Sequence, residues 1–289
     1  MDTRIGFIGT GVMGFSMAGH LLDAGYPLGV FNRTRERAEP LVERGARWFD
    51  GPAELAAGSE VVITIVGFPA DVEQVYLGGD GVLAALSSGT IAVDMTTSSP
   101  ALARRIAEEG AARGIAVLDA PVSGGDTGAR NATLSIMVGG DEVAFAAVEP
   151  ILTVMGGTVV LQGGPGAGQY TKMCNQIAIA AGMLAVCESM AYAHAAGLDP
   201  FLVLNSIEHG AAGSWSLSNL MPRALRGDFA PGFKIKHFVK DLRIAVESAG
   251  EMGLDLRGLE QAYELYRRLE EEGAGEDGTH ALLRFYEEG

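Results

Sequence analysis

Short apolar runs alternate with helix-periodic stretches along roughly the first 160 residues of the chain. The apolar runs predict β-strands, and stretches with apolar residues every three or four positions predict helices. Predicted strands cover residues 4–8, 28–31, 61–66, 91–95, 115–119, 134–138 and 158–161. Predicted helices between them cover residues 35–44, 71–76, 101–113 and 142–155. This alternation is typical of a mostly parallel sheet with helices on both faces. The strand at 134–138 ends in a glycine pair, so it either extends or pairs antiparallel at an edge.

The pattern changes after the segment Gly163-Gly164-Pro165-Gly166-Ala167-Gly168, which interrupts both periodicities. Beyond this segment we expect no strands. Residues 169–196 predict one long helix that is rich in Ala and Met and nearly apolar in its middle. A helix that is apolar on most sides is usually buried on most sides, so we expect it between domains or between subunits. Further helices are predicted at residues 200–209, 217–225, 238–252, 259–272 and 281–287.

The first predicted strand ends in a glycine pattern, Gly9-Thr10-Gly11-Val12-Met13-Gly14, and a helix-periodic segment follows at once. In this context Gly9 permits a tight turn and Gly11 lets a pyrophosphate approach the backbone. Gly14 lets the helix pack close to the strand. The free amides and the positive end of the helix then receive the phosphates. We therefore predict that these six residues bind a dinucleotide cofactor.

Together these patterns predict an α/β Rossmann-type doubly wound sheet followed by an all-α C-terminal domain. The 289 residues suffice for two domains. We expect a dinucleotide-binding domain at residues 1–162. A helical substrate and dimerisation domain is expected at residues 163–289, beginning with the long interdomain helix.

Composition and charge narrow the functional classes. Hydrophobic residues make up 48% and charged residues 20% of the chain, as in an ordinary globular protein. The formal net charge is -15, from 36 acidic and 21 basic residues. This charge argues against a general nucleic-acid or anionic-membrane binder. An anionic cofactor or substrate must then be held by local positive groups.

The cysteines and the chain's apolar runs bear on metal binding and location. Cys174 and Cys187 fall on the predicted long helix, where a disulfide is geometrically implausible, and no zinc-type spacing is present. No metal site is expected. The first strand begins by Ile5, which leaves no room for a signal peptide, and the longest apolar run (residues 177–187) is too short for a bilayer. We expect a cytoplasmic protein.

The end of the second predicted strand indicates which dinucleotide is bound. An acid at this tip would accept from the adenine ribose and select NAD. Here the tip reads Asn32-Arg33-Thr34, followed by Arg35 and Arg37. An arginine fork can bind a 2′-phosphate at two points, whereas a carboxylate would repel it. The plainer alternative is a solvated basic start to a helix. We predict that NADP is preferred and that NAD is possible.

Three further segments are candidates for the chemistry. In one of them, Phe233 with Lys240-Asp241-Leu242, Lys240 offers a second positive charge and Phe233 an apolar wall; the alternative is an ordinary surface helix feature. Ser123, Gly124 and Gly125 follow the strand at 115–119, where a hydroxyl and two glycine amides form a compact anion cradle. The alternative is a plain strand-to-helix turn. Lys172 lies in the first turn of an otherwise apolar helix, where the dipole disfavours a cation. Partial burial and nearby positive charge would lower its pKa, so that it could exchange a proton with a carbonyl oxygen. Asn175 lies three residues on, on the same face, and could hold the reacting oxygen or the lysine.

Four segments, in this order, resemble the β-hydroxyacid dehydrogenase family. The family includes 3-hydroxyisobutyrate dehydrogenase, tartronate semialdehyde reductase and the glyoxylate/succinic semialdehyde reductases. The segments are Gly9-x-Gly11-x-Met13-Gly14-x-x-Met17, Asp119-Ala-Pro-Val-Ser-Gly-Gly125, Gly166-x-Gly-x-x-x-Lys172-x-x-Asn175 and Lys240-Asp241-Leu242. The similarity covers nearly the whole chain. One departure is Gly67-Phe68-Pro69, where many members have Leu-Pro beside the cofactor.

The resemblance assigns roles to residues that the patterns alone leave open. It implies that Lys172 is the catalytic residue and that the Ser123 cradle binds the substrate carboxylate. It implies that Thr97 and Lys240 lie against the cofactor. In semialdehyde-reducing members, residues matching Phe233 and Asp241 line the substrate site. The tip at residues 32–34 resembles the NADP-type version of the family. Assembly as a homodimer or homotetramer is implied as well.

The resulting prediction is an NADP-dependent oxidoreductase that interconverts a short semialdehyde or oxo acid and its hydroxy acid. Succinic semialdehyde or glyoxylate reduction and 3-hydroxyisobutyrate oxidation are the candidate reactions. The expected partner is a small carboxylate-bearing substrate, with neither nucleic acid nor membrane. One alternative is a non-catalytic NADP-binding sensor or scaffold, which would not need Lys172 or Asn175. Another is an imine reductase-like enzyme, although those enzymes have Asp or Tyr in place of Lys172.

Overall fold

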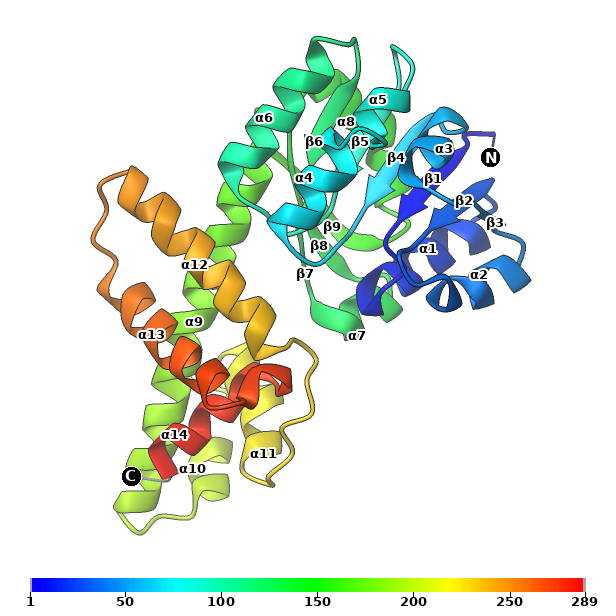
Figure 1. Cartoon of the computed structure of the whole chain (residues 1–289). Helices are drawn as coiled ribbons and strands as arrows, with labels where there is room; N and C mark the ends of the chain where they lie inside the picture. Colours follow the sequence, from blue (N-terminus) through cyan, green and yellow to red (C-terminus); the bar gives the residue numbers. More distant parts are fainter. Residues whose placement is uncertain (1, 288–289) are drawn as a thin grey trace. The chain divides into compact units, whose positions relative to one another are not determined.

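The computed structural model describes residues 2–287 and divides into two compact units. The first unit ends at Lys172 and the second begins at Met173. The division falls inside the long helix α9 (Ala167–Ala195), which therefore contributes its first residues to one unit and the rest to the other (Figure 1). The domain boundary expected after residue 162 stays a prediction.

The first unit is built on a nine-stranded sheet, as far as residues 2–172 describe it. Its strands are β1 (Ile5–Ile8), β2 (Leu28–Phe31), β3 (Arg47–Trp48), β4 (Val61–Thr64), β5 (Ile91–Asp94), β6 (Ala116–Asp119), β7 (Val122–Ser123), β8 (Leu134–Gly139) and β9 (Gly156–Gly163). The order is β3-β2-β1-β4-β5-β6-β8-β7, with β9 paired to β8. Strands β1 to β6 are parallel to one another, so their carboxyl ends meet at one edge. The predicted Rossmann-type fold is confirmed.

Helices cover both faces of this sheet. They are α1 (Val12–Asp23), α2 (Glu39–Glu43), α3 (Pro52–Ala57), α4 (Pro69–Leu77), α5 (Val82–Ala85), α6 (Pro100–Ala111), α7 (Gly125–Arg130) and α8 (Glu142–Leu152), with the 3₁₀ turn η1 (Arg35–Arg37). Because side chains alternate along a strand, Phe7 packs with α1, α2 and α8, while the next residue, Ile8, packs with α3 to α6. Ile63 and Val62 divide between the two cores in the same way. Burial on both faces explains why these strands are continuous apolar runs.

Several details differ from the sequence-based expectations. The predicted helix at residues 35–44 is two pieces, η1 and α2, because Pro40 lacks an amide and restricts the residue before it. Strand β8 does pair antiparallel, with β6 and β7, but it is not an edge because β9 lies on its other side. The two-residue strands β3 and β7 were not predicted, since so short a segment has no periodicity to detect.

The second unit is helical. After α9 it contains α10 (Pro200–Ile207), the π-helical turn η2 (Ser216–Leu220), α11 (Met221–Ala224), α12 (Ile235–Glu251), α13 (Arg257–Glu271), the 3₁₀ turns η3 (Ala274–Glu276) and η4 (Thr279–Leu283), and α14 (Arg284–Glu287). Between residues 173 and 287 the β-pairing is limited to an isolated bridge between Lys234 and Gly278.

The apolar composition of α9 is matched in part by its burial in the core of the second unit. Over its best 18-residue window the mean hydropathy is 1.4, so by length and composition the whole helix could cross a membrane, although its longest uninterrupted apolar run is too short. Met183, Cys187 and Met190 are almost completely buried in the core of the second unit. These side chains place one face of α9 in that core. Only 39% of the window is buried among the described residues, less than the sequence pattern predicted for a helix buried on most sides.

Candidate active site

The glycine turn between β1 and α1 has the backbone that the sequence pattern predicts. Gly9 has φ +98°, and a Cβ there would clash with the carbonyl oxygen of Ile65. A Cβ on Gly14 would clash with the carbonyl oxygen of Gly9, so helix and strand approach closely. At Gly11 a Cβ would meet nothing within 4 Å. Gly11 also caps α1, and neither a capping side chain nor an acidic first-turn residue is present there. The exposed amide end of α1 therefore fits an anionic pyrophosphate.

The tip of β2 is joined directly to this turn. Asn32 Oδ1 accepts a hydrogen bond from the Thr10 amide at 3.0 Å, and Asn32 Nδ2 donates to the Thr34 carbonyl at 2.7 Å. The Arg33 side chain is 89% exposed and lies 3.4 Å from Asp71 on α4. The Arg35 guanidinium stacks over the Trp48 ring at 5.2 Å. Asn32 thus fixes the backbone at the corner where the adenine ribose is expected, and Arg33 lies beside it.

Two buried carboxylates shape the carboxyl edge of the sheet. Asp94, at the end of β5, accepts hydrogen bonds through Oδ1 from the Thr64 hydroxyl and the Thr96 amide, each at 3.0 Å. Asp119, at the end of β6, accepts from the Gly166 amide at 2.7 Å and the Gln169 amide at 2.8 Å. Asp119 therefore fixes the start of α9 on the sheet edge. Neither carboxylate was assigned a role from the sequence.

Burial raises the pKa of both Asp94 and Asp119 to about 6, and their hydrogen bonds oppose that shift. Because the folded-state pKa of Asp94 lies above its ordinary value of 3.8, the folded protein binds the extra proton. Stability is therefore lost as the pH rises from about 4 to about 6, and the loss is complete above that range.

The variant Asp94→Asn should remove this loss. The asparagine Oδ1 can still accept both hydrogen bonds but carries no charge. The difference in unfolding free energy between variant and wild type should grow with pH by up to roughly 3 kcal/mol, at 1.36 kcal/mol per pKa unit. Urea denaturation from about pH 4 to about pH 7 measures it. A difference that does not change with pH would contradict the raised pKa of Asp94.

The predicted anion cradle lies between β7 and α7. Ser123 is half-buried at the end of β7, and Gly124 and Gly125 have φ +131° and +63°, which an L-residue would adopt only with strain. At the other end of α7, His20 Nε2 lies 2.9 Å from the Ala129 carbonyl and 3.1 Å from that of Arg130. Helix α7 is therefore held against α1, and the glycine turn lies at the amino end of α1.

Lys172 and Thr97 also belong to the first unit. The Lys172 residue is only 6% exposed, which is uncommon for a lysine, and it lies one turn beyond Gln169 on α9. Thr97 follows β5 at the carboxyl edge. Within this unit the glycine turn, the β2 tip, Thr97, the cradle and the start of α9 follow β1, β2, β5, β7 and β9, and Asp119 joins the start of α9 to the end of β6.

The remaining predicted residues belong to the second unit. Asn175 Nδ2 donates to Gln176 Oε1 at 2.7 Å, and Gln176 Nε2 donates to Asp241 Oδ2 at 2.6 Å. Asp241 Oδ1 lies 3.1 Å from Lys240 Nζ, and both residues are buried. Phe233 is 37% exposed and stacks on His237, with 6.4 Å between the ring centroids. The sequence reasoning missed Gln176; a polar residue in the apolar stretch of α9 was its only signal.

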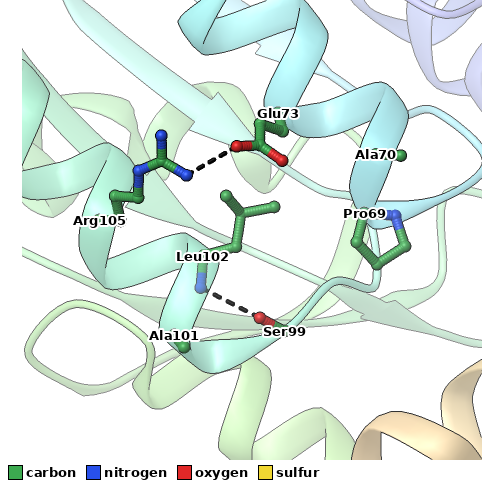
Figure 2. A pocket seen from close by; sticks show the side chains of 7 residues that line it. All are labelled: Pro69, Ala70, Glu73, Ser99, Ala101, Leu102 and Arg105. Atoms are coloured by element: carbon green, nitrogen blue, oxygen red, sulfur yellow. Dashed lines mark hydrogen bonds and ion pairs between the residues drawn. The ribbon is translucent and has the colours of Figure 1, made fainter.

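A separate cavity of about 410 Å³ opens between the first turns of α4 and α6 (Figure 2). It is lined by Pro69, Ala70, Glu73, Ser99, Ala101, Leu102 and Arg105. Figure 2 shows Arg105 pointing toward Glu73, at 2.6 Å, along one side. None of the site residues predicted from the sequence lines this cavity.

Comparison with known proteins identifies the family. The family model of the NAD binding domain of 6-phosphogluconate dehydrogenase matches residues 4–164. A second model, described as NAD-binding of NADP-dependent 3-hydroxyisobutyrate dehydrogenase, matches residues 166–286.

The similarity to individual proteins extends over the full length. An uncharacterized oxidoreductase of Bacillus subtilis (strain 168), YkwC, is 52% identical over 99% of both chains. The 2-hydroxy-3-oxopropionate reductase of Escherichia coli (strain K12) is 37% identical over 98% of this chain and 97% of its own. The structure of Mycobacterium tuberculosis 3-hydroxyisobutyrate dehydrogenase with L-serine has a TM-score of 0.91, at 30% identity and 99% coverage of both chains.

A glycine turn at the switch point of a doubly wound sheet is the usual site of a nicotinamide dinucleotide. With both family models matched, the chain is an oxidoreductase that uses a nicotinamide cofactor. It belongs to the β-hydroxyacid dehydrogenase family, as a hydroxyacid dehydrogenase of the 3-hydroxyisobutyrate dehydrogenase type. The structure of an imine reductase from Myxococcus stipitatus is similar at a TM-score of 0.67. Because the two sequences are only 20% identical, this similarity concerns the fold alone.

Proposed function

We propose that this enzyme uses NADP(H) to interconvert a short semialdehyde or oxo acid and its hydroxy acid. The candidate reactions are reduction of succinic semialdehyde or glyoxylate and oxidation of 3-hydroxyisobutyrate. The observation that carries the proposal is a buried lysine, Lys172, on a helix whose start is hydrogen-bonded to the carboxyl edge of the nucleotide-binding sheet. A buried lysine at the edge of the sheet where the cofactor is proposed to bind is suited to moving a proton.

Each residue has a defined part in this proposal. The turn from Gly9 to Gly14, including Thr10, Val12 and Met13, holds the pyrophosphate, and Asn32, Arg33 and Thr34 hold the adenine ribose end. Thr97 and Lys240 contact the cofactor, which when bound supplies or accepts the hydride.

The chain's other residues bind the substrate and move the proton. Ser123, Gly124 and Gly125 bind the substrate carboxylate through a hydroxyl and two amides. Lys172 Nζ donates a proton to the substrate oxygen during reduction and accepts one during oxidation. Asn175 orients that oxygen. Phe233 and Asp241 complete the substrate site.

The preference for NADP is carried by Arg33. The variant Arg33→Ala should weaken NADPH binding by about 10–100-fold and leave NADH binding unchanged, because a charged hydrogen bond is worth roughly 1.5–3 kcal/mol. Fluorescence titration with both cofactors measures the ratio. Arg257→Ala is a matched control, since Arg257 is 90% exposed and also lies 3.4 Å from an aspartate. An unchanged affinity ratio in Arg33→Ala would remove the proposed preference.

A substrate panel tests the activity itself. The purified enzyme is supplied with NADPH or NADH and with glyoxylate, succinic semialdehyde or methylmalonate semialdehyde, and absorbance at the NADPH band is followed. Oxidation of 3-hydroxyisobutyrate is followed with NADP⁺. We expect turnover of at least one of these short acids. Cofactor binding without turnover would favour a sensor or scaffold, and turnover confined to a cyclic imine would favour an imine reductase-like enzyme.

The assembly and location complete the proposal. We propose a homodimer or homotetramer in the cytoplasm, without nucleic-acid or membrane partners. Support comes from the net charge of -15 and from the family membership. Light scattering of the purified protein gives the oligomer size.

A further inference from the structure

Neither the sequence analysis nor the proposed mechanism assigns a role to Gln169. This residue lies on the first turn of α9 and is completely buried. Its amide oxygen Oε1 accepts a hydrogen bond from the Ser98 amide at 2.9 Å. Its Nε2 donates to the Thr96 carbonyl at 2.8 Å. One side chain thus satisfies two backbone groups, and those groups flank Thr97.

Segment 96–98 is also held from its opposite side. The Thr96 hydroxyl accepts from the Val66 amide at 2.9 Å, and the Thr96 amide donates to Asp94 at 3.0 Å. The backbone amide of Gln169 donates to Asp119. The loops after β4 and β5, the end of β6 and the start of α9 therefore form one hydrogen-bonded frame. Gln169 is the side chain that closes this frame between segment 96–98 and α9.

We propose that Gln169 is a positioning residue that sets Lys172 relative to the backbone that carries Thr97. Lys172 lies three residues beyond Gln169 on the same helix, so a shift of the first turn of α9 moves Gln169 and Lys172 together. Gln169 itself is assigned no contact with substrate or cofactor. The inference rests on the proposed roles of Lys172 and Thr97. Misplacing a catalytic group by about 1 Å can cost on the order of 100-fold in rate.

The variant Gln169→Met tests this role, because it keeps the approximate volume of the side chain and removes both hydrogen bonds. We expect kcat to fall about 10–100-fold while the KM of the acid substrate changes less than about threefold. Hydrogen exchange at the Ser98 amide should accelerate, since its acceptor is gone. Wild-type kcat, or unchanged protection of the Ser98 amide, would overturn the proposal.

A second variant separates positioning from loss of bulk. Gln169→Glu retains the acceptor for Ser98, but its ionised form places a carboxylate against the Thr96 carbonyl. Protonation restores the donor, so kcat relative to wild type should recover as the pH falls from about 8 to about 6. Asp94, Asp119 and Lys172 lie on the elements that pack around this site, so wild type and Gln169→Met are profiled in the same buffers. A ratio that stays constant with pH would contradict the two-bond role.

The control removes a buried hydrogen bond that is no part of the frame around segment 96–98, and it keeps the aromatic ring that packs on Phe238. Tyr266 is completely buried in the second unit and its hydroxyl donates to the Thr279 carbonyl at 2.8 Å. Tyr266→Phe should lower stability without changing kcat. If wild type reduces none of the tested acids, the proposed function fails, but exchange at the Ser98 amide still reports whether Gln169 holds segment 96–98.

Discussion

The variant Lys172→Ala should lose about 10²–10⁴-fold in kcat, the usual contribution of a general acid or base, while its NADPH dissociation constant stays within about threefold of wild type. The amine belongs to a buried residue at the start of α9, whose backbone hydrogen bonds to Asp119 do not depend on this side chain. Stopped-flow measurement of NADPH oxidation gives the rate, and fluorescence titration gives the affinity.

A second substitution controls for the space that the lysine fills. Lys172→Met keeps most of the side-chain volume and lacks only the titratable amine, so it should lose as much rate as Lys172→Ala. Added small primary amines should restore part of the activity of Lys172→Ala, because the truncation leaves room for them. Turnover near the wild-type rate in either variant would show that another group moves the proton.

A matched pair of glycine substitutions has the second largest expected effect. Gly14→Ala should lower the unfolding free energy by about 3 kcal/mol, the upper end of the cost of overpacking, because its Cβ would overlap the backbone carbonyl of Gly9. Gly11→Ala should cost less than about 1 kcal/mol, since its φ is −73° and nothing lies within 4 Å of the new Cβ.

Cofactor binding should rank the same two variants differently. Folded Gly11→Ala should bind NADPH about tenfold or more weakly, a loss of roughly 1.4 kcal/mol, because the methyl group projects into the space proposed for the pyrophosphate. Thermal unfolding with and without NADPH measures both effects. A Gly11→Ala protein that bound NADPH as tightly as wild type would move the pyrophosphate away from this turn.

The candidate site is supported by buried polar groups to which the proposal assigns no contact with the substrate. Asp94 and Asp119 fix backbone amides at the ends of β5 and β6, and Gln169 joins the loop after β5 to α9. In the second unit Gln176 connects Asn175 to Asp241. Buried polar networks of this kind lock the rotamers and loops on which catalytic groups depend.

Much of the fold and part of the site could be predicted from local patterns. The buried parallel strands are recognisable because both of their faces need apolar side chains. The glycine turn is recognisable because Gly9 needs a positive φ and Gly14 has no space for a Cβ. Lys172 and the cradle could be proposed as candidates because a cation in an apolar helix and a Ser-Gly-Gly turn are locally unusual.

The sequence by itself determined the kinds and order of the longer elements, the glycine turn and the residues that carry the proposed chemistry. Only the tertiary structure decided which buried polar groups meet, because the partners are far apart along the chain. Gln169 bonds to residues 71 and 73 positions away, and Gln176 to one 65 positions away. A glutamine has no periodicity or backbone requirement of its own, so its role arises only when folding brings its partners within hydrogen-bond distance.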